Sequence, residues 1–106
     1  MKMKLEIYSI YDFASKTYNA PYYQKTDEAA LQHFVSLTND ENSLISKFPD
    51  QFALFNIGIF NDESGFIETY DQPKRLGLAK DFLSKDKQKE LLLKRLTEFL
   101  EQNKED

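Results

Sequence analysis

An acidic cluster between two apolar stretches is the first place where this sequence could bind a cation. Residues 61–65 read Asn-Asp-Glu-Ser-Gly and separate the apolar residues 54–60 from residues 66–70. A calcium loop uses about six oxygen ligands spread over ~12 residues, whereas this cluster offers only Asp62, Glu63 and Ser64. Asn, Asp and Ser also favour tight turns, and Gly65 can adopt a positive φ angle. We therefore predict a β-hairpin turn here and no metal site.

Enzymatic chemistry has few candidate residues in this chain. The sequence contains no cysteine and a single histidine, His33, in the middle of a predicted helix and on or beside its apolar face. A partly buried structural role suits that position better than the role of a general base. The three glycines, Gly58, Gly65 and Gly77, form neither phosphate-binding glycine motif. We predict a protein that is not an enzyme, with no catalytic residues and no cofactor.

The first quarter of the chain is unusually rich in aromatic residues and carries interleaved lysines. Flat rings can stack on the bases of single-stranded nucleic acid, each stacked base contributing ~1–3 kcal/mol, while lysines follow the phosphates. Tyrosines also form strands well and pair across hairpins, which is the structural alternative. The aromatic residues are Tyr8, Tyr11, Phe13, Tyr18, Tyr22 and Tyr23, and the lysines are Lys16 and Lys25.

The first half of the chain predicts a hairpin followed by a helix. Residues 3–11 alternate in the manner of a strand, residues 12–16 suit a turn, and residues 17–24 predict a second strand. Pro21 cannot donate to a strand ladder and therefore favours an edge or a strand end. Thr26 can cap a helix that starts at residue 27 and is broken at residues 39–43. A short apolar connector follows over residues 43–49.

The second half predicts another hairpin and two helices. Residues 52–60 are apolar on both faces, which predicts a central strand covered on both sides. Residues 66–70 would pair with it, residues 74–83 would form a short helix weakened by Gly77, and residues 85–106 would form a long helix. The fold class is therefore α+β: an antiparallel sheet of two β-hairpins (β-β-α-β-β-α) with a C-terminal amphipathic helix.

The long C-terminal helix carries one narrow apolar stripe. We divide the chain into an α+β core domain, residues 1–84, and this helix, residues 85–106. The stripe could dock on the sheet or meet its copy on another subunit as a short coiled coil. For a homo-oligomer we expect the interface at Leu92, Leu96, Phe99 and Leu100, four of the stripe residues Leu92, Leu93, Leu96, Phe99 and Leu100.

Charge is distributed unevenly along the chain. The net charge is −4, yet residues 26–72 carry Lys47 against nine acidic residues, and residues 73–95 carry eight Lys and Arg against three acidic residues. The basic segment adds Lys74 and Arg75 to the candidate phosphate contacts. The acidic segment supports a different function, binding of a host or phage protein through an acidic face. The N-terminus lacks a signal-peptide pattern, and no apolar stretch reaches the ~20 residues of a membrane span, so we expect no membrane partner.

The order of these motifs resembles the small non-structural protein of gokushoviruses, which are microviruses, phages with single-stranded DNA genomes. Its two patterns match residues that span most of residues 4–83, namely Tyr8, Asp12, Ala14, Tyr18 and Pro21, then Leu54, Phe55, Ile57, Gly58, Phe60, Asn61, Ser64, Gly65 and Pro73. The resemblance implies a replication-stage protein of the host bacterial cytoplasm, often labelled DNA-binding, and it carries over no catalytic residues.

Together, these observations predict a non-enzymatic phage protein that binds single-stranded DNA in genome replication or packaging. We expect it to form a homo-oligomer and to meet a host or phage replication protein. The expected DNA contacts are Tyr8, Tyr11, Phe13, Lys16, Tyr18, Tyr22, Tyr23, Lys25, Lys74 and Arg75.

Overall fold

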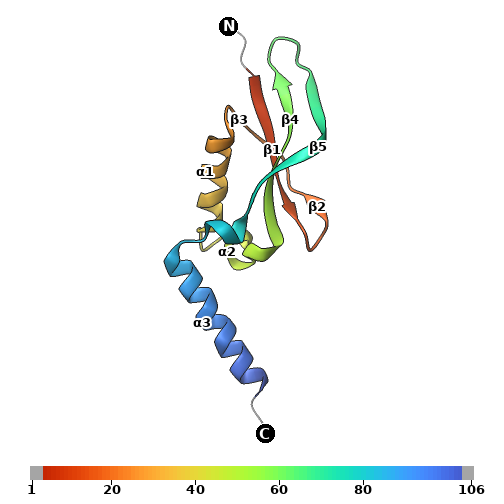
Figure 1. Ribbon diagram of the computed structural model, residues 1–106. Helices are drawn as coiled ribbons and strands as arrows, with labels where there is room; N and C mark the ends of the chain where they lie inside the picture. The colour runs from red at the N-terminus through yellow and green to blue at the C-terminus, as the bar shows by residue number, and fades with distance from the viewer. Residues whose placement is uncertain (1–3, 104–106) are drawn as a thin grey trace.

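The computed structural model describes residues 4–103, and its α+β architecture confirms the predicted fold class. One five-stranded antiparallel sheet carries helices on one of its faces, and the last helix extends away from the sheet (Figure 1). The elements are β1 (Lys4–Asp12), β2 (Thr17–Tyr18), β3 (Tyr22–Gln24), α1 (Asp27–Thr38), α2 (Leu44–Lys47), η1 (Pro49–Gln51), β4 (Phe52–Asn61), β5 (Ile67–Leu78), η2 (Ala79–Phe82) and α3 (Lys85–Gln102).

The first hairpin forms as predicted, but its second strand is split. Strand β1 pairs with β2 through Tyr11 opposite Tyr18 and with β3 through Ile7 opposite Tyr23. Residues 19–21 lie between the two short strands, because Pro21 has no amide hydrogen for the ladder. The continuous strand predicted over residues 17–24 is therefore wrong at its centre.

The second hairpin also forms, and the acidic cluster is its turn, as predicted. Asn61 accepts hydrogen bonds through its Oδ1 from the backbone amides of Glu63 (3.0 Å) and Ser64 (3.4 Å), and Gly65 has a φ of 75°. These side-chain bonds to the local backbone are typical of a turn. The cluster thus reverses the chain between β4 and β5.

Strand β5 is longer than the sequence predicts. Residues 74–78, predicted to begin a helix, continue β5, and only Ala79–Phe82 form a 3-10 turn. The strand lies at the edge of the sheet, where Pro73 is tolerated, and it bulges there: Thr69 and Lys74 pair with Gly58 and Asn56. Pairing with the central strand β4 overrides the helical preference of the basic sequence.

Helix α1 covers one face of the sheet and closes the hydrophobic core. Thr26 caps the helix by accepting a hydrogen bond from the Ala29 amide, as predicted. Its buried residues Ala30 and Phe34 pack on the sheet, with α2 and η2 at the lower end. The core consists of Tyr8, Ile10, Ala30, Phe34, Ile45, Phe52, Leu54 and Ala79.

The opposite face of the sheet has no helix over it within residues 4–103 (Figure 1). Strand β4 is central, between β1 and β5, as predicted. The sequence predicted that β4 is covered on both sides, but helices cover it on one side only. Residues of β4 that point to the open face, such as Phe55 and Phe60, are half-buried.

Helix α3 forms as predicted up to Gln102, while residues 104–106 of the predicted helix, like residue 3 of the first predicted strand, lie outside the described part. It begins at the cap Ser84 and projects from the body, so that the molecule measures 68 × 25 × 20 Å (Figure 1). None of its side chains is buried. An ion pair between Arg95 and Asp50, 3.1 Å, joins it to η1. The helix therefore does not dock on its own sheet.

Candidate nucleic-acid interface

Four aromatic rings from three strands and a turn meet on the open face of the sheet. Because residues of a strand alternate between faces and cross-strand partners share one, Tyr11, Tyr18 and Phe55 lie on the same side. The ring of Tyr11 lies 5.0 Å from that of Phe13, 4.7 Å from that of Tyr18 and 6.1 Å from that of Phe55, centre to centre. Phe55 lies 5.9 Å from Tyr18. These tilted and edge-to-face contacts hold the rings as one cluster.

A second pair of rings extends this surface toward the other end of the sheet. Tyr23 lies opposite Ile7 in the β1–β3 pair, and Phe60 lies opposite Leu5 in the β1–β4 pair. Their ring centres are 6.1 Å apart. Phe13, Tyr18 and Tyr23 remain 43%, 47% and 43% exposed, so flat ring surfaces are available to a ligand.

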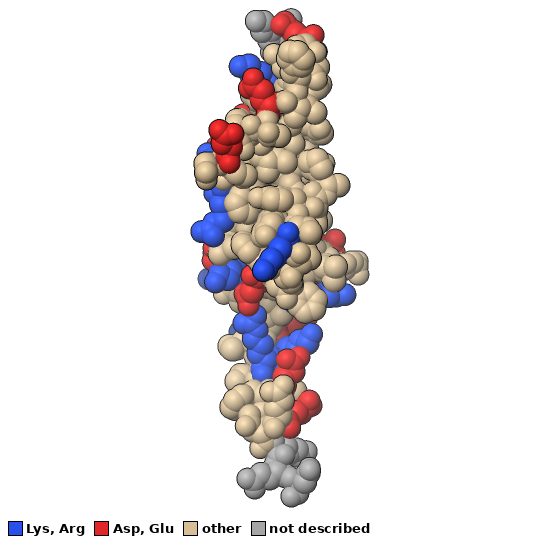
Figure 2. Space-filling view, turned by 90° about the vertical axis from the view of Figure 1, so that its right-hand side faces the viewer, with Lys and Arg blue, Asp and Glu red and all other residues tan. Residues whose placement is uncertain are grey.

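Basic side chains accompany these rings, although the face as a whole is nearly uncharged. Arg75 lies opposite Phe55 in the β4–β5 pair and shares its face. Lys16 is exposed in the turn that also contains Phe13, and Lys25 is exposed just after β3. Figure 2 views the side away from α1 and shows a broad uncharged surface with Lys and Arg side chains in it, and with both basic and acidic side chains along its edges. The arrangement suits a ligand that is flat and carries negative charge at intervals.

Three of the predicted contact residues lie on the other face and are corrected here. Tyr8 is fully buried under α1, and Tyr22 packs against the core, where its hydroxyl donates to the Ala30 carbonyl oxygen (2.9 Å). Neither ring can stack on a base in this fold. Lys74 forms an ion pair with Asp27 on the helix-covered face, 3.1 Å. Tyr11, Tyr18, Tyr23 and Arg75 lie on the open face, and Phe13 contacts it through Tyr11. Lys16 and Lys25 are exposed, one in the turn before β2 and the other just after β3.

His33 also departs from its predicted environment. The residue is exposed and not partly buried, and its ring lies 4.9 Å from that of Tyr22, edge to face. It covers the outer side of a tyrosine that belongs to the core.

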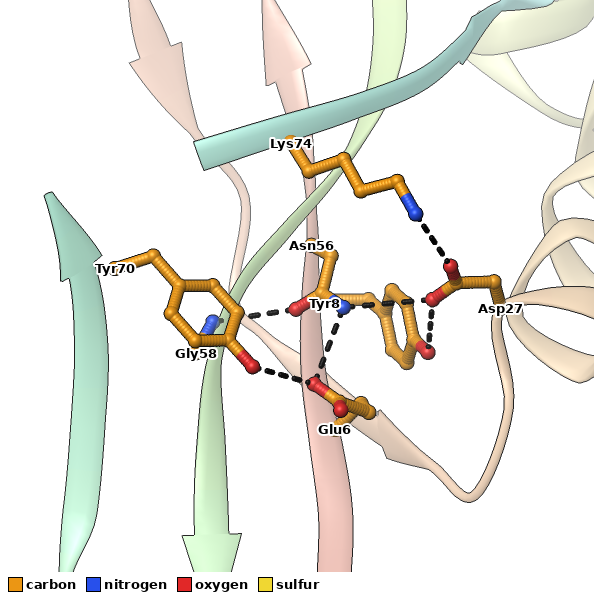
Figure 3. A network of polar contacts seen from close by, with 7 residues as sticks. All are labelled: Glu6, Tyr8, Asp27, Asn56, Gly58, Tyr70 and Lys74. Atoms are coloured by element: carbon orange, nitrogen blue, oxygen red, sulfur yellow. Dashed lines mark hydrogen bonds and ion pairs between the residues drawn. The ribbon is translucent and has the colours of Figure 1, made fainter. Parts of the chain in front are cut away.

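A polar network occupies the helix-covered face, beside the start of α1 (Figure 3). The Tyr8 hydroxyl donates to Asp27 Oδ1 (2.8 Å), and Lys74 Nζ donates to Asp27 Oδ2. Asn56 Nδ2 donates to Glu6 Oε2 (3.1 Å) and to Asp27 Oδ1 (3.4 Å). The Tyr70 hydroxyl donates to Glu6 Oε2 as well (3.0 Å). The network thus ties the first turn of α1 to β1, β4 and β5.

The network also perturbs the acidity of its members. The hydrogen bond from Tyr8 lowers the pKa of Asp27 against the opposing effect of burial, and Lys74 and Asn56 lower it further. Burial, and then the contact with Asp27, raises the pKa of Tyr8 far above its ordinary value. Each of these side chains forms a hydrogen bond or ion pair that joins two elements of the fold.

The comparison with known families adds the decisive observation: the family model described as phage ORF5 protein matches residues 5–82. The chain belongs to the phage ORF5 protein family. It is therefore a phage protein. No curated protein and no solved structure matches it. The matched region of this ORF5 family member contains the sheet, both faces and the polar network, and it ends before α3 begins at Lys85.

Phe55 and Phe60 belong to the open face of this ORF5 protein and were missed by sequence reasoning. The sequence contained a signal for these two residues, because both occur in the apolar run of residues 52–60. A run that is apolar on both faces predicts cover on both sides, and here exposed aromatic rings provide that cover instead of helices.

Within residues 4–103, no helix is long and apolar enough to cross a membrane.

The acidic residues of segment 26–72 lie on several elements of the fold. Asp27 and Asp50 are paired with Lys74 and Arg95. Asp40 follows the C-terminal end of α1, whereas Asp62 lies in the β4–β5 turn at the opposite end of the body (Figure 1). The predicted acidic docking face is therefore spread over several elements.

Proposed function

We propose that this phage protein binds single-stranded DNA on the open face of its sheet, without enzymatic activity, in genome replication or packaging. The observation that carries the proposal is the set of exposed rings of Phe13, Tyr18 and Tyr23 on a face that no helix covers within residues 4–103. Such rings provide stacking platforms for bases, while Lys16 and Arg75 provide cations for phosphates. The gokushovirus resemblance supports the same role and a site of action in the host bacterial cytoplasm.

The charges of the chain make a quantitative expectation possible. With Lys16, Lys25 and Arg75 each neutralising one phosphate, the logarithm of affinity falls with the logarithm of salt with a slope of roughly 2. Raising salt from about 50 to about 200 mM then weakens binding roughly 20-fold. The net charge of −4 opposes binding at long range, so we expect modest affinity at a single face.

The test is fluorescence anisotropy with labelled oligo-dT at both salt concentrations. We expect Tyr18→Ala and Phe13→Ala to weaken binding about tenfold each, because each removes a stacking platform. Phe66→Ala is the matched control: this ring is 74% exposed in the β4–β5 turn and lines a hollow with Ile59 and Glu68, which lie on the face of Glu6 and not on that of Phe60. Absence of binding at the lower salt, or equal loss in the control, overturns the proposal.

A second candidate is binding of a host or phage replication protein, and the nearly uncharged open face in Figure 2 favours it. Apolar aromatic surfaces of this kind also suit protein interfaces. Pull-down from host lysate with and without nuclease separates the two functions. A nuclease-resistant partner that is lost in Tyr18→Ala, together with no oligo-dT binding, would select the protein partner.

We include homo-oligomerisation through α3 in the proposal. A second copy would place another open face on the same particle, and two linked sites bind one DNA strand more tightly than either alone.

A further inference from the structure

The apolar stripe of α3 is uncovered in the single chain. Its five residues are 49% to 68% exposed, from Leu96 to Leu100. The partly buried residues of the helix, Lys87 and Leu91, lie toward the body. Lys87 precedes Leu96 by nine residues, which is two and a half helical turns, so the stripe points away from the body. Five large apolar side chains on one free helix face mark an interaction surface.

The charges of α3 run against its own dipole. Residues 85–95 contain five Lys and Arg against two acidic residues, whereas residues 96–103 contain Glu98 and Glu101 and no basic residue. A helix N-terminus favours negative charge and a C-terminus favours positive charge. This arrangement is unfavourable in an isolated helix, and it becomes favourable beside a helix of the opposite direction and the same sequence.

The stripe is also symmetric about Leu96. Leu92 and Leu100 lie four residues to either side of it, and Leu93 and Phe99 lie three residues to either side. A two-fold axis at Leu96 therefore places Leu92 opposite Leu100 of a second copy, and Leu93 opposite Phe99. The apolar pattern matches itself best when the two helices run in opposite directions.

We propose that α3 pairs antiparallel with α3 of a second copy of this chain, with the two-fold axis at Leu96. The basic half of each helix then lies beside the acidic half of its partner. Lys85 and Lys89 precede Leu92 and Leu96 by seven residues each and continue the stripe. In a parallel pair, each of these lysines would face its own copy. In the antiparallel pair, Lys89 lies beside Asn103 at the negative C-terminal end of the partner helix, and Lys85 lies beyond that end.

This inference specifies the oligomer that the proposed function includes, and it holds whether or not the open face binds DNA. The chain contains no cysteine, so single introduced thiols report the geometry directly. A disulfide needs Cα atoms about 4.4–6.8 Å apart. Position 92 lies about 12 Å along the axis from position 92 of an antiparallel partner, and next to position 100.

The experiment is oxidative crosslinking of full-length single-cysteine variants. We expect Leu96→Cys to crosslink with itself, and Leu92→Cys and Leu100→Cys to crosslink only when mixed with each other. Self-crosslinking of all three variants would instead show a parallel pair and overturn the inference. Glu98→Cys, away from the stripe, is the control and should stay uncrosslinked.

Light scattering on the unmodified full-length chain completes the test. We expect a dimer at about 100 μM and a monomer for Leu96→Glu, whose dissociation constant should rise more than tenfold because two charges enter one apolar contact. Circular dichroism must show that Leu96→Glu keeps the sheet. A monomeric unmodified chain overturns the pairing, whereas oligo-dT binding by that monomer would leave the DNA proposal standing.

Discussion

At the scale of single residues, the polar network decides how the start of α1 is held to the sheet. Asp27 receives hydrogen bonds from Tyr8, Asn56 and Lys74, which come from three different strands. Buried polar groups are stabilising only while their partners remain. Removing one donor should therefore cost more than the net value of a typical hydrogen bond.

Tyr8→Phe tests the buried member of the network. The substitution removes the hydroxyl and leaves Asp27 Oδ1 with one fewer donor, so we expect a loss of roughly 1–3 kcal/mol in the free energy of unfolding. Urea denaturation followed by circular dichroism measures it. Tyr70→Phe, the control, removes an exposed hydroxyl from Glu6 and should cost less than about 1 kcal/mol. Equal costs would contradict a special role for the buried contact.

Acid should reduce the contribution of the Asp27 contacts to the stability of the fold. The folded-state pKa of Asp27 lies below the value of 3.8 expected for an unfolded chain, so its contribution to stability is present above that pH. As pH falls through 3.8 toward the folded-state pKa, the unfolded state binds the proton first and the contribution is lost. Asp27→Asn should therefore show a weaker loss of stability than the unmodified protein over this range. An identical acid profile would show that Asp27 does not contribute.

The core tyrosines should resist ionisation in base. Burial raises the pKa of Tyr22 to about 12 and that of Tyr8 further, from an ordinary value of 10.0. Because the unfolded tyrosines ionise first, stability should fall as pH rises above 10.0. Burial and the hydrogen bond to Glu6 raise the pKa of Tyr70 as well, so phenolate absorbance should show three late-titrating tyrosines, and Tyr22→Phe should remove one of them.

At the scale of elements, glycine decides how closely β5 can approach β4. A Cβ atom on Gly58 would lie 2.3 Å from the Glu68 carbonyl oxygen, which belongs to the backbone and cannot move aside alone. We expect Gly58→Ala to destabilise the fold by roughly 1–3 kcal/mol, as overpacking does. Gly65→Asn is the control, because it has open space and Asn tolerates the positive φ. Thermal unfolding compares the two variants.

Local sequence was sufficient for the elements whose signals are local. The Thr26 cap, the period of α3 and the turn at Asn61 each depend on residues a few positions apart. Residues 74–78 were predicted helical because pairing of an edge strand with β4 is not visible locally. Tyr8 and Tyr22 were predicted on the exposed face but lie on the helix-covered face, because tyrosine suits both a core and an exposed sheet face. Alternation separates Tyr8 from Tyr11, but only the position of α1 decides which face is covered.

At the scale of the whole molecule, α3 should be dispensable for the core fold. None of its side chains is buried, so a chain that ends at Ser84 should unfold within a few degrees of the full-length protein. Its mass by light scattering should be that of a monomer, whereas the full-length protein should be a dimer. A shortened chain that remains dimeric would assign self-association to the sheet.

The projection of α3 from the body also has a geometric consequence for a paired molecule. Opposed helices would hold the two sheets at the far ends of a rod, with the two Lys85 positions about 33 Å apart along the axis of the helix pair. A short oligonucleotide would reach one sheet, and only a longer one could bridge both. Apparent affinity would then increase abruptly at a threshold of oligonucleotide length. Leu96→Glu, which separates the two copies, would lose this dependence on length.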